Sequence, residues 1–366
     1  MTFFSLLLLF TGLYSLMIIL FTVAAVKAKY HATAGYRPFV SIIIAARNEE
    51  QNIGNCLQSL STLSYPRDLF EIIIVDDRSA DSTASIVRTF AADHPWAKLI
   101  TAEPGSGEIQ GKTNALTQGI DAAKGEILLF TDADCIVRPE WIERTVSYYA
   151  DESIGVVAGF TELRAKGQFE EMQTLDWLFL FTVAAATIRL RYPVTAVGNN
   201  LSVRKKAYDL VGGYRKIPFS VTEDYALFHA ITATKSYRAR FPMDPSMLVK
   251  SAACSTLTQL HNQKLRWFRG GRDMELKSMG IFGGAYLLNA FLLGGIFVLP
   301  AHQIAVALGM KIVVDIGLLL PALMRFKRMS LLRSFPLFEG YFLLYVLLYP
   351  VLILLGHSVI WKERSF

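Results

Sequence analysis

Long runs of apolar residues near both ends limit the folds open to this sequence. Residues 3–26 contain no charged side chain. As a helix rising about 1.5 Å per residue, they are long enough to cross a bilayer core of about 30 Å. Lys27 and Lys29 follow this run and no basic residue precedes it, which is the reverse of the order in a cleavable signal peptide. We therefore expect residues 1–27 to form an uncleaved transmembrane helix.

The last quarter of the sequence contains three further apolar stretches, at 281–300, 301–324 and 335–360. They predict a C-terminal transmembrane region over residues 281–366. Residues 325–328 form a basic connector, and basic connectors stay on the cytoplasmic side of a membrane. We therefore expect an integral protein of a cell's inner membrane, with the N-terminus outside and the central domain in the cytoplasm.

Two ionisable residues, Lys311 and Asp315, interrupt the second of these stretches. Because they are four residues apart, they share one helix face and can pair there. Ionisable groups at membrane depth form functional relays or packed pairs that face neighbouring helices. The packed pair is the simpler interpretation here.

Composition narrows the choice of partners. The net charge is +6, but the basic residues cluster beside the apolar stretches, where anionic headgroups attract them. No nucleic-acid-binding motif accompanies them, so we expect a membrane partner and no nucleic acid. The widely spaced Cys56, Cys135 and Cys254 lack metal-ligand spacing and indicate free thiols in a reducing compartment.

Between residues 38 and 255, short apolar runs alternate with helical patterns, which predicts an α/β domain with a mostly parallel sheet. We expect strands at 40–46, 71–75, 98–102 and 126–130. The second strand ends in Asp76 and Asp77, and the fourth is followed by Asp132 and Asp134. Ligands of open α/β sheets bind beyond the carboxyl ends of the strands. These acidic residues therefore indicate a site.

Asp132 and Asp134 flank one small residue. In an extended segment, side chains two residues apart point the same way. Two carboxylates so placed can hold Mg²⁺ or Mn²⁺ together with the phosphates that the ion carries. An acidic turn without any ligand is the alternative.

Two later segments also admit two interpretations each. Asp224 opens a helical stretch, where it either caps the helix or acts as a general base towards an acceptor hydroxyl. An amphipathic helix expected at 256–280 carries Gln263, Arg266 and Trp267. That helix either rests at the membrane interface or offers an arginine fork to a diphosphate and a flat indole to a sugar or acceptor.

Residues 39–272 resemble the family 2 glycosyltransferases, whose catalytic domain has the GT-A fold. The resemblance depends on an ordered set of motifs: SIIIAARNEE, IIIVDDRSADST, GKTNAL, LLFTDADC, GNNLSVRKKAY with GGY, TED and QKLRW. The DxD, TED and QxxRW motifs in this order are similar to those of the membrane branch, which includes ceramide glucosyltransferases and processive synthases.

The resemblance implies a role for each matching residue. It implies that the following bind the nucleotide-sugar: Ala45, Arg47, Glu49, Asp76, Asp77, Lys112, Asp132, Gln263, Arg266 and Trp267. It further implies that Asp134, with Asp132, binds Mg²⁺ or Mn²⁺ and that Asp224 is the catalytic base. Family members invert the anomeric configuration in a single displacement, for which one base and one metal suffice.

The expected function is transfer of a single sugar from a UDP-sugar or another nucleotide-sugar to a membrane lipid at the cytoplasmic face, as in glycolipid biosynthesis. A processive polysaccharide synthase is the first alternative, although such enzymes need a channel and usually more than four spans. A non-catalytic nucleotide-sugar-binding subunit is the second, and the presence of Asp134, Asp224 and Arg266 argues against it. The sequence leaves the sugar and the class of lipid (sphingolipid, diacylglycerol, polyprenyl phosphate or carotenoid) open.

Overall fold

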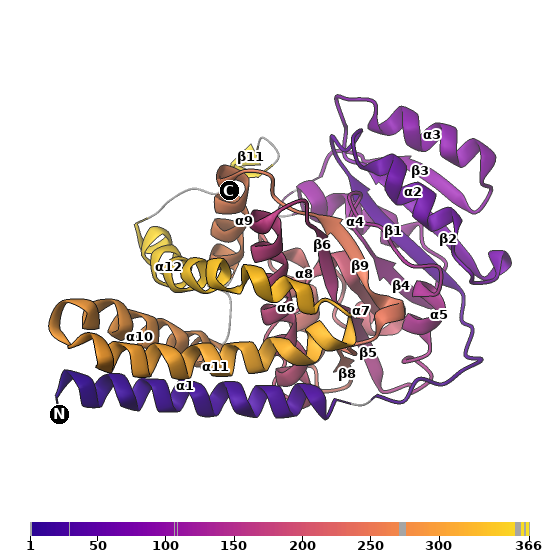
Figure 1. Ribbon diagram of the computed structural model, residues 1–366. Coiled ribbons are helices and arrows are strands. Elements are labelled where there is room, and N and C mark those ends of the chain that lie inside the picture. The colour runs from indigo at the N-terminus through magenta and orange to yellow at the C-terminus, as the bar shows by residue number, and fades with distance from the viewer. Residues whose placement is uncertain are drawn as a thin grey trace. The chain divides into compact units, whose positions relative to one another are not determined.

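The computed structural model describes residues 2–28, 30–105, 107, 109–270, 276–355, 360–361 and 364–365. The chain forms two compact units (Figure 1). The first, here called the α/β unit, consists of Lys29–Arg164 and Thr195–Ala252. The second, the helical unit, consists of Met1–Ala28, Ala165–Val194 and Ala253–Phe366.

A seven-stranded sheet of order β3-β2-β1-β4-β7-β5-β8 forms the centre of the α/β unit. Its strands are β1 (Val40–Ala46), β2 (Phe70–Asp76), β3 (Ala97–Thr101), β4 (Ile127–Phe130), β5 (Ile154–Ala158), β7 (Leu201–Arg204) and β8 (Arg238–Arg240). The first four pair in parallel, β7 runs antiparallel between β4 and β5, and β8 is parallel to β5. A second, two-stranded sheet pairs β6 (Thr161–Arg164) with β9 (Val249–Ala252). The predicted mostly parallel α/β fold is thus confirmed.

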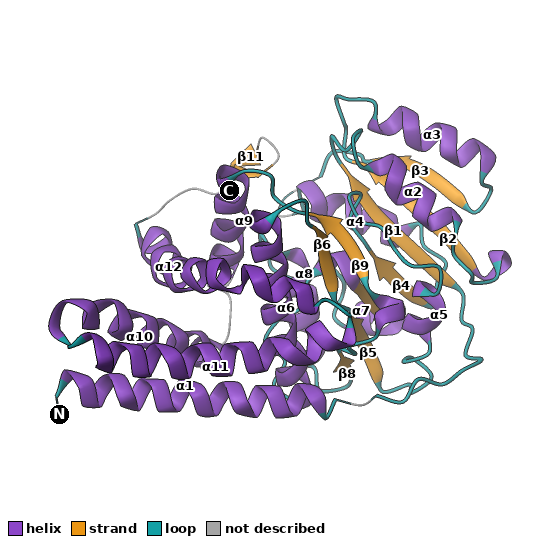
Figure 2. Ribbon diagram, in the orientation of Figure 1, coloured by secondary structure: helices purple, strands orange, loops and turns teal. Residues whose placement is uncertain are grey.

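Helices cover both faces of the large sheet (Figure 2). They are α2 (Ile53–Ser61), α3 (Thr83–Asp93), α4 (Gly111–Asp121), α5 (Trp141–Val146), α7 (Lys205–Leu210) and α8 (Glu223–Ala233). Residues of α2, α3 and α5 pack on one face with Ile42 and Ile72, while α4 packs on the other with Ile73 and Val75. Because both faces are covered, β1 and β2 are nearly continuous apolar runs. Gly119 lets α4 approach closely, since a Cβ there would lie 2.7 Å from Ile43 Cγ2.

The helical unit contains six long helices within the described residues. They are α1 (Phe3–Val26), α6 (Gln168–Arg189), α9 (Leu257–Gly270), α10 (Leu276–Val298), α11 (Ala301–Arg325) and α12 (Phe335–Leu354). Four described segments are long and apolar enough to cross a membrane: Phe3–Val26, Gly280–Val298, Ala301–Arg325 and Met329–Leu354. The last includes the short 3-10 helix η5 (Met329–Ser334). This agrees with the expected one N-terminal and three C-terminal spans.

Two expected boundaries differ from the structure. The last apolar helix ends at Leu354 rather than at residue 360, and Ile360 belongs to the short strand β10 (Ile360–Trp361), which pairs with β11 (Arg364–Ser365). The amphipathic helix expected at 256–280 corresponds to α9 up to Gly270, and α10 begins at Leu276. The residues between α9 and α10 lie outside those described.

Lys311 and Asp315 form the packed intramembrane pair predicted from their spacing. Lys311 Nζ lies 2.7 Å from Asp315 Oδ2, and both side chains are fully buried. The structure adds two partners from other helices. Glu339 of α12 pairs with the same ammonium group, and the Tyr14 hydroxyl of α1 donates a 2.6 Å hydrogen bond to Asp315. The pair therefore links three of the apolar helices.

Candidate active site

The carboxyl ends of β1 and β2 bring the first predicted site residues together. Ala46 and Asp76 are partners in the parallel register, and the Asp77 N–H donates a 2.8 Å hydrogen bond to the Ala46 carbonyl. Arg47 Nη1 lies 3.8 Å from a carboxylate oxygen of buried Asp77. The Asp76 carboxylate accepts hydrogen bonds of 3.3 Å from the Ser79 N–H.

Two more predicted residues belong to the same edge of the sheet. Ala45 is the last residue but one of β1, and it packs against the apolar cluster beside α4. Glu49 follows β1, and its carboxylate accepts a 3.0 Å hydrogen bond from Asn52 Nδ2. An arginine beside carboxylates at strand ends offers both a charged fork and acceptors to a polar ligand.

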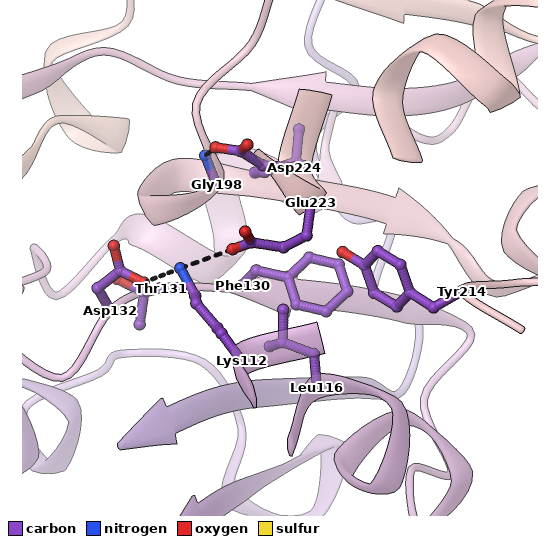
Figure 3. Close-up of a pocket in the computed structure, with 10 residues that line it drawn as sticks. Lys112, Leu116, Phe130, Thr131, Asp132, Gly198, Tyr214, Glu223 and Asp224 are labelled. Carbon is purple, nitrogen blue, oxygen red and sulfur yellow. Dashed lines mark hydrogen bonds and ion pairs between the residues drawn. The ribbon is translucent and has the colours of Figure 1, made fainter. Parts of the chain in front are cut away.

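A pocket lies beyond the carboxyl end of β4 (Figure 3). Its lining residues are Lys112, Leu116, Phe130, Thr131, Asp132, Gly198, Leu201, Tyr214, Glu223 and Asp224. Lys112 of α4 lies at its centre, with Nζ 2.8 Å from Asp132 Oδ1 and 3.0 Å from Glu223 Oε1. The pocket thus combines three predicted residues from three parts of the chain: Lys112, Asp132 and Asp224.

The electrostatics of this pocket keep Lys112 charged. Burial by itself would lower the pKa of Lys112, but the carboxylates of Asp132 and Glu223 outweigh it and raise that pKa well above its usual value. Burial, together with the negative charges of Glu223 and Asp224, raises the pKa of Tyr214, whose phenol therefore stays neutral. The pocket presents one cation surrounded by carboxylates.

Asp224 lies in the first turn of α8, as expected, and its carboxylate accepts one hydrogen bond from outside that helix and one from within it. Oδ2 accepts a 2.6 Å hydrogen bond from the backbone N–H of Gly198, in the 3-10 helix η2 (Gly198–Asn200). Oδ1 accepts a 2.8 Å bond from the Tyr225 N–H. A capping side chain needs only the N–H groups of its own helix, so the hydrogen bond from Gly198 is an additional contact. It fixes the direction of the carboxylate.

The expectation that Asp132 and Asp134 extend in parallel from a strand is wrong. Strand β4 ends at Phe130, and the Cys135 N–H donates a 3.0 Å hydrogen bond to the Asp132 carbonyl, which closes a turn. In a turn the two-residue alternation of strands does not hold. Asp132 is therefore paired with Lys112, whereas Asp134 Oδ2 accepts hydrogen bonds from Ser251 Oγ (2.9 Å) and the Ala252 N–H (3.2 Å).

The two carboxylates nevertheless suit a divalent cation bound with a substrate. Burial, then the negative charge of Asp132 and that of Glu49, raise the pKa of Asp134, and a bound cation would favour the ionised form of this carboxylate. Within the described residues no group of three or more His, Cys, Asp or Glu side chains is arranged to hold a metal ion. Mg²⁺ commonly uses only one or two carboxylates and takes its remaining ligands from phosphates and water. The donor set therefore fits an ion that arrives with a diphosphate.

The remaining predicted residues, Gln263, Arg266 and Trp267, belong to α9 in the helical unit and are partly buried. The Trp267 ring lies 5.4 Å from the Trp177 ring of α6, centroid to centroid. These three residues belong to a different compact unit from the pocket residues.

Sequence reasoning missed Glu223, Tyr214 and Gly198 as pocket residues. Each lies in a motif that the sequence displays, namely TED, GGY and GNN. The signal was present in those motifs, but a role for Glu223 becomes visible only when α4 and α8 are seen to place it against Lys112.

Comparison with known proteins identifies the family of the chain. The sequence profile described as Glycosyl transferase family 2 matches residues 41–225, about half of the chain. A beta-monoglucosyldiacylglycerol synthase of Trichormus variabilis is 30% identical over 250 residues, which cover 66% of this chain and 51% of that protein. A poly-beta-1,6-N-acetyl-D-glucosamine synthase of Staphylococcus epidermidis is 26% identical over 254 residues, 69% of this chain and 58% of that protein. The chain thus spans about half the length of the curated relatives it matches.

A solved structure shares the fold. The mannosyltransferase PcManGT from Pyrobaculum calidifontis, in complex with GDP-Man and Mn²⁺, superposes with a TM-score of 0.63 at 20% identity. The match covers 93% of this chain and 99% of that one. The shared fold identifies the α/β unit of this chain as a GT-A-like catalytic domain, and the family match over half of the sequence establishes that the chain belongs to glycosyl transferase family 2.

Proposed function

We propose that the protein transfers a single sugar from a nucleotide-sugar, a UDP-sugar, to a membrane lipid and inverts the anomeric configuration. The observation that carries the proposal is the pocket in which Lys112, Asp132 and Asp224 meet at the carboxyl end of a family 2 sheet. Such a transfer needs a positive charge for the diphosphate, an acidic side chain for the nucleotide-sugar and its metal ion, and a base for the acceptor hydroxyl. Lys112, Asp132 and Asp224 would supply these three groups in that order.

The donor is held by the residues at the strand ends. Arg47, Asp77 and their neighbours receive the nucleoside, and charged Lys112 faces the diphosphate. Asp132 and Asp134 would hold Mg²⁺ or Mn²⁺, which when bound stabilises negative charge on the departing diphosphate. On α9, Gln263, Arg266 and Trp267 contribute contacts to the diphosphate and the acceptor.

The reaction is a single displacement. Asp224 takes the proton of the acceptor hydroxyl while that oxygen forms a bond to the anomeric carbon. The bond from this carbon to the diphosphate breaks on the opposite side, and its electron pair leaves with the nucleoside diphosphate. The Gly198 N–H keeps the carboxylate oriented for the proton transfer.

Two observations support a lipid acceptor at the cytoplasmic face. Four apolar helices provide a membrane anchor, and the relatives from Trichormus variabilis and Synechocystis sp. are named beta-monoglucosyldiacylglycerol synthases. The basic residues that follow the first span and precede the last favour a cytoplasmic α/β unit.

The test is an assay with purified full-length protein. Radiolabelled UDP-glucose, UDP-N-acetylglucosamine and GDP-mannose are each incubated with vesicles that contain diacylglycerol, ceramide or polyprenyl phosphate. We expect label in the organic phase as one discrete product with one of the two UDP-sugars, whereas label from GDP-mannose alone would contradict the proposed donor. The Asp224→Asn variant supplies the background.

A processive synthase is the second candidate, because relatives at 26% identity are named poly-beta-1,6-N-acetyl-D-glucosamine synthases. The same assay separates the two: a water-soluble ladder of product sizes would replace our proposal by polymer synthesis. Tight nucleotide-sugar binding with no product under any condition would identify a non-catalytic subunit.

A further inference from the structure

A buried ion pair links α9 to α6 within the helical unit. Lys264, inside the QKLRW segment, is only 1% exposed, and Asp176 of α6 is 3% exposed. The Lys264 ammonium group donates a hydrogen bond to Asp176 Oδ2. Neither residue belongs to the set that binds the donor or the metal in the proposed function.

Aromatic side chains complete the surroundings of this pair. The Tyr345 hydroxyl of α12 donates a 2.9 Å hydrogen bond to the second carboxylate oxygen of Asp176. Lys264 Nζ lies 4.2 Å from the centroid of the Trp267 ring and 5.1 Å from that of Tyr345. Cations bind favourably over such ring faces, most strongly when they are removed from water.

The spacing along α9 connects the pair to the motif. Residues three and four apart share a helix face, so Lys264 and Trp267 face α6 together. The adjoining part of this face contacts α12, since His261 and Phe268 are three residues before and four residues after Lys264. His261 is 3.0 Å from the Tyr349 hydroxyl, and Phe268 stacks on the Tyr349 ring. The ion pair adds a directional, hydrogen-bonded contact between α9 and α6 to the ring contact of Trp267 with Trp177.

We propose that Asp176 and Lys264 are positioning residues, which fix the rotation of α9 about its axis and thereby the orientation of Trp267 and Arg266. The inference rests on the proposed function, in which those two residues contact substrate. A role in stability alone explains the pair poorly, because buried ion pairs often contribute no more stability than apolar residues of the same size. What a buried pair with fixed hydrogen bonds does supply is one defined geometry.

The test compares Asp176→Asn with a matched control, Glu171→Gln. Glu171 lies on the same helix and its carboxylate is also paired, with Arg333 and Ser334, neither of them on α9. We expect Asp176→Asn to lower kcat at least about tenfold while the KM for nucleotide-sugar stays within about twofold. Glu171→Gln should leave both values near those of the wild type.

Two double variants distinguish a positioning role of Asp176 from a general disruption of the fold. The double variant Asp176→Asn with Lys264→Gln restores a neutral hydrogen-bonding pair and should recover most of the lost kcat. In a Trp267→Phe background, Asp176→Asn should cost less than about twofold, because the ring that it orients is absent. Equal losses in both backgrounds would show that Asp176 does not act through Trp267.

A measurement that does not depend on turnover tests the inference even if the proposed function is wrong. The protein contains five tryptophans, and labelling with 5-fluorotryptophan gives each a ¹⁹F signal, with that of Trp267 assigned from Trp267→Phe. We expect Asp176→Asn to shift or broaden the Trp267 signal and Glu171→Gln to leave it unchanged. An unchanged Trp267 signal in Asp176→Asn overturns the inference whether or not the wild type transfers sugar. A shifted signal without any wild-type turnover upholds the positioning of Trp267 and refutes the proposed function.

Discussion

The backbone N–H of Gly198 donates a 2.6 Å hydrogen bond to the Asp224 carboxylate, although the two residues are 26 positions apart in the chain. The contact also specifies glycine, since a Cβ at Gly198 would lie 2.8 Å from Asp224 Cβ. Asp224 is thus fixed by a neighbour that cannot change its own charge. Two substitutions therefore test this contact: one at Asp224, which removes its charge, and one at Gly198, which adds a side chain where the carboxylate needs space.

Asp224→Asn should lower kcat by at least about a hundredfold, because the amide keeps the shape of the carboxylate but cannot accept the proton. Nucleotide-sugar affinity, measured by calorimetry, should stay near that of the wild type. Wild-type turnover in this variant would reduce Asp224 to a helix cap.

Gly198→Ala should lower kcat by about tenfold or more through displacement of Asp224 rather than loss of its charge. Gly54→Ala is the matched control, because a Cβ at Gly54 of α2 meets nothing within 4 Å. Steady-state kinetics of both variants measures the effect. Equal activities in the two would show that the Gly198 contact does not matter for catalysis.

Lys112→Met should weaken nucleotide-sugar binding at least about tenfold, which corresponds to about 1.4 kcal/mol. The substitution leaves Asp132 and Glu223 facing the diphosphate without the intervening cation. Glu223→Gln keeps Lys112 paired with Asp132 and should weaken binding less. Calorimetric titration with the nucleoside diphosphate compares them, and the opposite order would place Glu223 rather than Lys112 at the ligand.

Asp134 should make stability depend on pH and on metal. Its raised pKa means that the folded chain binds a proton more readily than the unfolded chain. The melting temperature without metal should therefore fall as the pH rises through that raised pKa. Mn²⁺ favours the ionised carboxylate and should cancel the fall, and Asp134→Asn should show neither effect.

EDTA should abolish transfer and Mn²⁺ or Mg²⁺ restore it, whereas full activity in excess EDTA contradicts the metal assignment.

The orientation in the membrane is open to cysteine labelling. With Cys254 replaced by serine, a cysteine at exposed Lys124 of the α/β unit should resist an impermeant thiol reagent in intact cells. One at exposed His302, in the first turn of α11, should react. Native Cys56 and Cys135 are buried and give little background. Labelling at position 124 without permeabilisation would reverse the predicted topology.

Local patterns were sufficient to predict most elements. Strand β1 has the bounds expected from its apolar run, and the pair Lys311–Asp315 follows from helical spacing alone. Both depend on residues close in the chain, where period and spacing determine the outcome.

Predictions failed or stopped short where distant segments decide the geometry. The ion pair between Lys112 and Glu223 requires α4 and α8 to face each other, which no local pattern encodes. The segment after Phe130 was expected to be extended, but it forms a turn, because the Cys135 N–H donates a hydrogen bond to the Asp132 carbonyl. Lys264 belongs to the amphipathic helix expected at 256–280, and only its contact with α6 shows that it is buried.

The hydrogen bond between Tyr14 and Asp315 joins residues 301 positions apart, which has a consequence for biogenesis. At a synthesis rate of about 5–20 residues per second, α1 waits in the membrane for roughly 15–60 s before its partner is made. Lys311 and Asp315 then enter on one helix, so that their opposite charges offset each other during insertion. Glu339 arrives last, on α12. The bundle is therefore completed only after α12 has been made, and α1 expressed as a separate peptide should be able to associate with the remaining helices.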